Sequence, residues 1–157
     1  MGRIESLRGR ARGVLGNLHW LAPLLGRLAV GLVFMSTGWG KVHNIEKFTG
    51  FFTSLHIPAP HFQAILVGYS ELLCGTALVL GLLTRLATVP LVVSMIVAIL
   101  TAKLPELHNV FDLVGFDEFT YLVVLVMIAI LGPGSHALDA ILVRLLGWQE
   151  AHLDVAT

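Results

Sequence analysis

Charged residues are scarce in this chain. Asp, Glu, Lys and Arg make up 13% of its 157 residues, whereas a soluble domain normally carries about a quarter. The ten basic and ten acidic residues cancel, so no net charge attracts the chain to nucleic acid or to an acidic partner. The single cysteine, Cys74, cannot build a disulfide framework. These shortages exclude a disordered segment, a nucleic-acid-binding domain and a disulfide-framed secreted domain.

Apolar residues are abundant, at 56% with a mean hydropathy of +0.85, and they occur in long runs. Seventeen uncharged residues separate Arg85 from Lys103, and twenty separate Glu118 from Asp139. A membrane-crossing helix needs ~17–25 such residues. Two earlier segments are each interrupted by one charge, and neither shows the polar stripe of a soluble helical bundle. We therefore predict an all-α membrane protein, an antiparallel bundle of four transmembrane helices.

The predicted organisation is a single membrane domain over residues 20–148, with a basic arm before it (1–19) and a short tail after it (149–157). Its spans are expected at about residues 20–41, 62–84, 86–103 and 119–132. Four spans divide the basic residues between the two sides, with Arg3, Arg8, Arg10, Arg12, Arg85 and Arg144 on one side and Lys41, Lys47 and Lys103 on the other. The larger basic excess marks the cytoplasmic face, so both termini are predicted to be cytoplasmic.

Short interfacial helices are predicted at two places. In the first outer loop, Ile45, Phe48, Phe51, Phe52 and Leu55 share one helical face, as in helices that lie in the membrane interface. After the fourth span, Gly132-Pro133-Gly134 should stop the helix, and residues 137–148 form the second amphipathic segment. The acidic second outer loop is either a solvated cap, or a docking surface or lid.

Glu71 is the most informative residue, because an ionisable side chain inside the hydrocarbon costs at least ~2.5–3.5 kcal/mol. It lies about 14 Å down a helix that starts at Phe62. Without a partner it would be protonated, since desolvation disfavours the charged carboxylate. Two interpretations stay open. Glu71 exchanges protons or holds the polar head of a ligand, or it ties the bundle together through Arg27 or a hydroxyl on a neighbouring helix.

Other candidate ligand contacts lie on the same two helices. Arg27, about 11 Å inside the first span, can extend toward Glu71 or toward the cytoplasmic interface. Lys41 ends the first span, where it serves as an interface anchor or as a cation for an anionic head group. His43 and Trp39 flank Lys41 and are further candidates.

Metal and thiol chemistry are not predicted. The four outer histidines, His43, His56, His61 and His108, have no i, i+3 or i+4 pair among them, and the chain has no CxxC or CxxCH motif. We expect no metal or haem. Cys74 lies three residues after Glu71 and is a candidate ligand contact, but it has no second thiol for an intramolecular disulfide.

Small residues in the first two spans predict close helix packing, notably Gly31 and Gly38 in one and Gly68 and Gly75 in the other.

Motifs distributed over about Leu21 to Leu146 resemble those of the DoxX family of small bacterial integral membrane proteins. They run through Gly38-x-x-Lys41, Ile57-Pro58, Gly68…Glu71…Gly75, Gly81-Leu82-x-Thr84-Arg85-x-Ala87 and Gly132-Pro133-Gly134…Asp139. The motif positions carried over are Arg27, Gly38, Lys41, Pro58, Glu71, Gly75, Thr84, Arg85 and Asp139. The resemblance implies a four-helix protein of the bacterial inner membrane. Some members are linked to quinone-dependent oxidation of sulfur compounds such as thiosulfate, and others to membrane oxidoreductase complexes and redox stress.

Three functions are compatible with these residues. The first is a membrane subunit of a quinone-linked oxidoreductase system, not a complete enzyme alone, that binds a quinone or similar polar-headed lipid near Glu71. The second is a non-catalytic scaffold or assembly partner for an extracytoplasmic or membrane oxidoreductase. The third is transport of a small solute or proton. Expected partners are the lipid bilayer and other oxidoreductase subunits, with a homo-oligomer as a further option.

Overall fold

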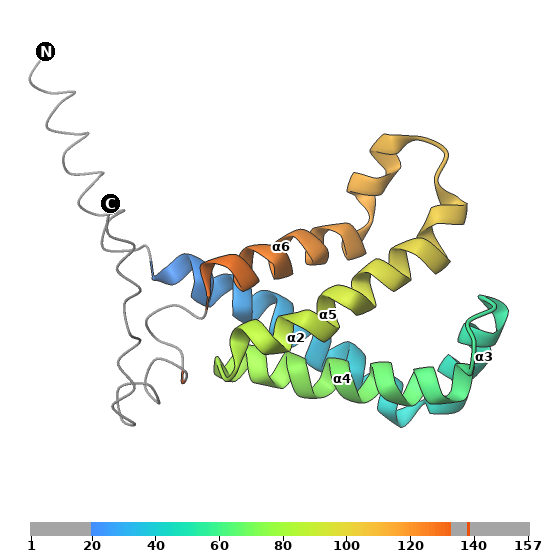
Figure 1. Cartoon of the computed structure of the whole chain (residues 1–157), viewed down its shortest axis with the longest axis horizontal. Coiled ribbons are helices and arrows are strands. Elements are labelled where there is room, and N and C mark those ends of the chain that lie inside the picture. The colour runs from blue at the N-terminus through green and yellow to red at the C-terminus, as the bar shows by residue number, and fades with distance from the viewer. Residues whose placement is uncertain (1–19, 133–137, 139–157) are drawn as a thin grey trace, which may run out of the picture.

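The computed structural model describes residues 20–132 and residue 138, and this part of the chain is helical with no strand (Figure 1). The long helices are α2 (Leu21–His43), α4 (Pro60–Leu80), α5 (Thr84–Ala98) and α6 (Asp117–Leu131). A short helix, α3 (Ile45–Ser54), joins α2 to α4. After α5 the chain continues as a π-helix, η1 (Ile99–Lys103), and two 3₁₀ segments, η2 (Leu104–Glu106) and η3 (Val110–Gly115).

Three stretches are long and apolar enough to cross a membrane: α2, α4 and the continuous helix from Thr84 to Lys103. Each overlaps a predicted span, so the all-α class is confirmed and these three helices are candidate membrane spans. Helix α6 has 15 residues, a rise of about 22 Å against a hydrocarbon core of about 30 Å. The fourth span therefore stays a prediction, as does the cytoplasmic location of the termini.

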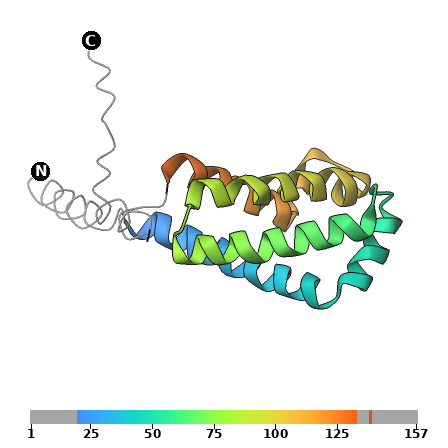
Figure 2. The same ribbon diagram turned by 60° about the horizontal axis from the view of Figure 1, so that its bottom comes forward.

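The helices alternate in direction along one axis (Figure 2). Helix α2 packs along α4, α5 packs along α6, and the two pairs touch through α4 with α5 and α2 with α6. One end of the bundle carries the turn at residues 81–83 and the end of α6. We call the opposite end, which carries α3 and residues 104–116, the α3 end (Figure 1).

The turn between α4 and α5 comes earlier than the sequence predicted. Gly81 has a φ of 71° and closes α4 at Leu80, because a glycine in this left-handed conformation satisfies the last helical carbonyls at low steric cost. Its N–H donates to the Leu78 carbonyl. Thr84 and Arg85, expected at the end of the second span, therefore begin α5 instead.

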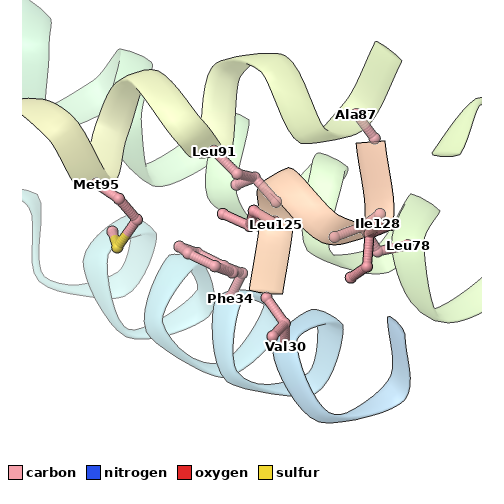
Figure 3. Packing of buried hydrophobic residues seen from close by; sticks show 8 residues of the cluster. All are labelled: Val30, Phe34, Leu78, Ala87, Leu91, Met95, Leu125 and Ile128. Atoms are coloured by element: carbon pink, nitrogen blue, oxygen red, sulfur yellow. The ribbon is translucent and has the colours of Figure 1, made fainter. Parts of the chain in front are cut away.

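The apolar core lies where the two helix pairs meet (Figure 3). Its buried side chains come from all four long helices: Val30, Phe34, Leu78, Ala87, Leu91, Met95, Leu125 and Ile128. Phe34 also meets the Tyr121 ring of α6 edge-on, with 6.0 Å between centroids. This core joins α2 and α4 to α5 and α6.

Two glycine pairs bring α2 and α4 into backbone contact. A methyl group at Gly38 would overlap the backbone nitrogen of Leu72 and lie 2.9 Å from the carbonyl carbon of Glu71. At Gly75 it would lie 2.5 Å from the backbone nitrogen of Met35. Gly31 and Gly68 make similar close approaches. The equal spacing of the two pairs sets the antiparallel register of the helices, and the predicted packing role of these glycines is confirmed.

Replacing Gly38 with alanine should separate α2 from α4 beside Glu71. Forcing extra carbon atoms into a packed contact costs about 1–3 kcal/mol, which exceeds the roughly 1 kcal/mol that alanine gains over glycine in a helix. We expect Gly38→Ala to lower the unfolding midpoint of the detergent-solubilised protein. Gly40→Ala is the matched control, because no atom lies within 4 Å of an added methyl group there. Equal midpoints for the two variants would contradict this account of the register.

Helix α3 confirms the predicted helix in the first outer loop, while its place in a membrane interface stays a prediction. It has no buried residue and packs against α4. In the second loop, Asp112 accepts hydrogen bonds from the backbone N–H groups of His108 and Asn109. Lys103 and Glu118 form an ion pair at 3.9 Å. Part of the acidic charge of that loop thus stabilises the loop itself. The predicted arm, the helix over 137–148 and Asp139 lie outside the described residues.

Candidate ligand-binding site at the Glu71–Lys41 ion pair

Glu71 lies near the middle of α4, about 16 Å along the helix from Pro60, and its side chain is 1% exposed. Both carboxylate oxygens accept hydrogen bonds. Lys41 Nζ and Thr37 Oγ1 donate to Oε2, the latter at 3.1 Å. Ser94 Oγ donates to Oε1, also at 3.1 Å. Glu71 therefore links α2, α4 and α5, and the predicted tie to a hydroxyl on a neighbouring helix is confirmed.

Lys41 is the charged partner of Glu71, although its position at the end of a span suggested an interface anchor. Its side chain is 16% exposed, and the Phe48 ring of α3 lies 5.8 Å from its ammonium. Burying an ion pair costs desolvation energy, which is recovered only when further hydrogen bonds satisfy the charged atoms. The two hydroxyls supply these bonds on the carboxylate side.

Arg27 does not reach Glu71. It is buried, with 2% exposure, but it precedes Lys41 by 14 residues on the same helix, or about 21 Å. The glycine register instead places it level with the turn at residues 81–83, at the opposite end of α2. The predicted Arg27–Glu71 tie is wrong, because antiparallel packing gives that position to Lys41.

Trp39 and His43 form a separate exposed pair. The His43 Nδ1 atom lies 3.0 Å from the Trp39 carbonyl oxygen, and the two rings are 4.1 Å apart. His43 follows Lys41 by two residues, so it is turned about 200° around α2. The structure therefore places the His43 side chain away from Glu71, although His43 is close in sequence to Lys41, the partner of Glu71.

Cys74 lies at the edge of a different feature. An open apolar groove of about 440 Å³ follows α4 from Phe62 to Cys74, with Tyr69 and Leu73 in its wall. These two residues flank Glu71 at two positions on either side, so they lie on the opposite face of the helix. Cys74 lines this groove and makes no described bond to the Glu71 carboxylate.

The other motif positions are distributed over the bundle. Gly38 and Gly75 form the α2–α4 contact, Thr84 is fully buried at the start of α5, and Pro58 is exposed before α4. A methyl group at Gly132 would lie 3.2 Å from the Arg85 guanidinium. The exposed Arg85 therefore lies beside the carboxyl end of α6, where a cation is favourable.

Sequence analysis missed Thr37, Ser94 and Phe48 as members of the site. The glycine spacing was the available signal: aligning Gly38 and Gly31 antiparallel with Gly68 and Gly75 brings the last turn of α2 beside Glu71. No comparable signal identified Ser94, because α5 also carries Thr84 and Thr88 and the sequence does not show which of these hydroxyls faces Glu71.

The fold and the site define a helical membrane protein with an ion pair held inside its bundle. The DoxX family model matches residues 22–104, and the chain belongs to the DoxX family, as its motifs predicted. The chain is 39% identical over 124 residues to "Uncharacterized membrane protein Rv3486" of Mycobacterium tuberculosis, covering 72% of this chain and 76% of that protein. It is 32% identical over 118 residues to "Putative oxidoreductase CatD" of Bacillus subtilis, covering 75% and 83%. No solved structure matches the chain significantly.

Removing one partner of the ion pair should destabilise the protein more than removing both. Lys41→Met leaves the Glu71 carboxylate buried without its cation, and Glu71→Leu leaves the ammonium. Breaking a buried pair in this way costs up to about 3–5 kcal/mol, whereas replacing both charges with apolar groups is often neutral. We expect the double variant Lys41→Met/Glu71→Leu to be more stable than either single variant, measured as the free energy of unfolding in detergent or bicelles.

The matched control is the pair Arg27→Met and Glu71→Leu. Because these residues are distant, their effects on unfolding should add within about 0.5 kcal/mol. Strong coupling of Glu71 to Arg27, or none to Lys41, would show that the ion pair is wrongly assigned.

Proposed function

We propose that this protein is the membrane subunit of a quinone-linked oxidoreductase system, and that Lys41 with Glu71 binds the quinone head. The observation that carries the proposal is a buried ion pair whose ammonium and one associated hydroxyl keep contact with the exterior of the bundle. The relative named as a putative oxidoreductase supports the same class of function. When bound, a quinone supplies a redox couple of two electrons and two protons, and the protein positions it and tunes it.

The residues fit such a group. A quinone head carries carbonyl oxygens that accept hydrogen bonds, and the Lys41 ammonium has three donors. Glu71 takes one of them. The Phe48 ring beside the ammonium offers an aromatic face for a flat head. Lys41 would donate to a carbonyl oxygen, Glu71 would hold the ammonium in place and accept a proton at Oε2, and Thr37 would fix the carboxylate.

This arrangement changes the roles that the sequence predicted. Glu71 is almost completely enclosed, so the ligand would contact Lys41, and Glu71 would act through Lys41. Arg27, His43 and Cys74 do not share the site and are no longer part of the proposed set. Trp39 is exposed and stays in the proposed set only as a residue near the exposed edge of the site.

A second function is a non-catalytic scaffold for another oxidoreductase. It is favoured by one observation: both oxygens of Glu71 already have hydrogen-bond partners within the chain. In that case Glu71 and Lys41 only fasten the three helices, and any apolar pair that restores stability should serve equally well.

The double variant Lys41→Met/Glu71→Leu separates the two functions, because it keeps the bundle folded without the donor. Under the quinone proposal, it should bind a short-tailed ubiquinone at least about tenfold more weakly than the parent protein. That factor corresponds to the loss of a hydrogen bond from a charged group. Tryptophan fluorescence quenching and the quinone content of the purified protein provide the two measurements.

Lys47→Met is the matched control, since Lys47 is an exposed lysine of α3 that makes no described contact with the site. It should bind quinone as the parent does. A stable double variant with parental quinone binding would contradict the quinone proposal. The scaffold function would be supported if that variant also kept cellular activity in a deletion strain.

A further inference from the structure

Thr37 is the member of the site that reaches the surface. Its side chain is exposed, yet its hydroxyl lies 3.1 Å from Glu71 Oε2 and also donates to the Phe34 carbonyl at 3.2 Å. Glu71 and Lys41 are 1% and 16% exposed, and Ser94 is half-buried. Thr37 is therefore the most exposed of the four polar residues of the site.

The exposed side of Thr37 faces the region between α2 and α6. Phe34, three residues earlier on the same face of α2, is buried against Tyr121 of α6. Helix α6 starts only four residues before Tyr121. It can therefore cover α2 for only about one helical turn beyond the Phe34–Tyr121 contact. Figure 1 shows the α5–α6 pair diverging from α2 and α4 toward the α3 end. On this face of α2, Phe34 is buried and Thr37 is exposed.

The route along the bundle axis is covered. Helix α3 packs against α4 at that end, and its Phe48 ring lies 5.8 Å from the Lys41 ammonium. The stem of Lys41 also lies against Gly68, where an added methyl group would come within 3.2 Å of the Lys41 Cβ. A ligand arriving from the α3 end would therefore pass Phe48 and the stem of Lys41.

The depth of Thr37 places it at the edge of the hydrocarbon. It precedes the last residue of α2, His43, by six residues, or about 9 Å, within a helix of membrane-spanning length. Trp39, two residues closer to that end, is 59% exposed, and exposed tryptophans gather at the level of the lipid head groups. Leu32, deeper on α2, is also exposed.

We propose that the Glu71–Lys41 site is reached sideways from the membrane, past Thr37 and between α2 and α6. Its ligand is then an amphiphile dissolved in the bilayer, with a carbonyl or hydroxyl head that meets Lys41 and Thr37. The ligand's identity as a quinone rests on the proposed function, whereas the route depends only on the position of Thr37.

A nitroxide label at position 37 tests the route without any ligand. Thr37→Cys is made in a Cys74→Ala background and labelled in liposomes. Its collision rates with oxygen, which concentrates in lipid, and with a water-soluble nickel chelate are measured by electron paramagnetic resonance. Leu32→Cys is the lipid reference and His43→Cys the aqueous reference, both on the same helix. Far-ultraviolet circular dichroism and gel filtration select folded variants.

We expect the oxygen-to-nickel collision ratio at position 37 to resemble that at position 32 and to exceed that at position 43 several-fold. A ratio equal to that at position 43 would overturn the proposal, since Thr37 would then face water. Thr37→Phe should also slow the association of a long-tailed quinone several-fold by obstructing the approach past position 37, whereas Lys47→Ala, at an exposed position of α3, should not change that rate. A faster rate in Phe48→Ala, with no effect of Thr37→Phe, would assign the route to the α3 end.

The two proposals fail separately. A lipid-facing Thr37 in a protein that binds no quinone removes the proposed function and leaves the route intact. A water-facing Thr37 in a protein that binds quinone through Lys41 removes the route and leaves the proposed function intact.

Discussion

The ion pair between Lys41 and Glu71 is the constraint on which the rest of this bundle depends. An isolated charge inside a membrane is expensive, so the two groups must meet, and they come from helices that run in opposite directions. Their meeting requires α2 and α4 to approach until their backbones touch, which Gly38 and Gly75 permit. It also requires one register, because a shift of one helical turn would move Lys41 by about 5 Å from the carboxylate. The glycines and the ion pair therefore specify the same arrangement from two independent physical requirements.

The third helix enters this arrangement through Ser94, and it carries two irregular positions. Pro90 lacks the N–H of a normal helical residue, and the last turn of the span is the π-helix Ile99–Lys103. Such features are where long helices change direction, and they lie on either side of Ser94. Helix α5 contacts Glu71 through Ser94, and the α5–α6 pair diverges from α2 and α4 toward the α3 end (Figure 1). As a result, the apolar core is continuous up to the Phe34–Tyr121 contact and the polar site lies at the rim.

The class of fold was predictable from the sequence because long uncharged runs have few alternatives in a chain this poor in charge. Glu71 was identifiable for the same reason, as a carboxyl where the hydrocarbon makes one costly. The partner was not, since counting residues from each predicted span start gave Arg27 a depth similar to that of Glu71 and placed Lys41 at the membrane surface, whereas the antiparallel register brings Lys41 to the carboxylate. The boundary at Gly81 was also missed, because Thr84 and Arg85 continue the apolar segment in composition while the backbone turns. For the ion pair the missing quantity was the register of α2 against α4, and the glycine spacing contains it.

The degree of enclosure separates a structural fastener from a binding site more clearly than the ion pair itself does. Contact with water weakens the electrostatic attraction within an ion pair, so exposure of one partner does nothing for a pair that serves only to hold helices together. Here the carboxylate is sealed by Thr37, Ser94 and the backbone of α2, while the ammonium meets an aromatic ring instead of a second anion. The Thr37 hydroxyl keeps one side exposed at the level where amphiphile heads lie. An ammonium with donors beyond the one that Glu71 accepts, beside an aromatic ring, suits a neutral, hydrogen-bond-accepting head that arrives through the membrane.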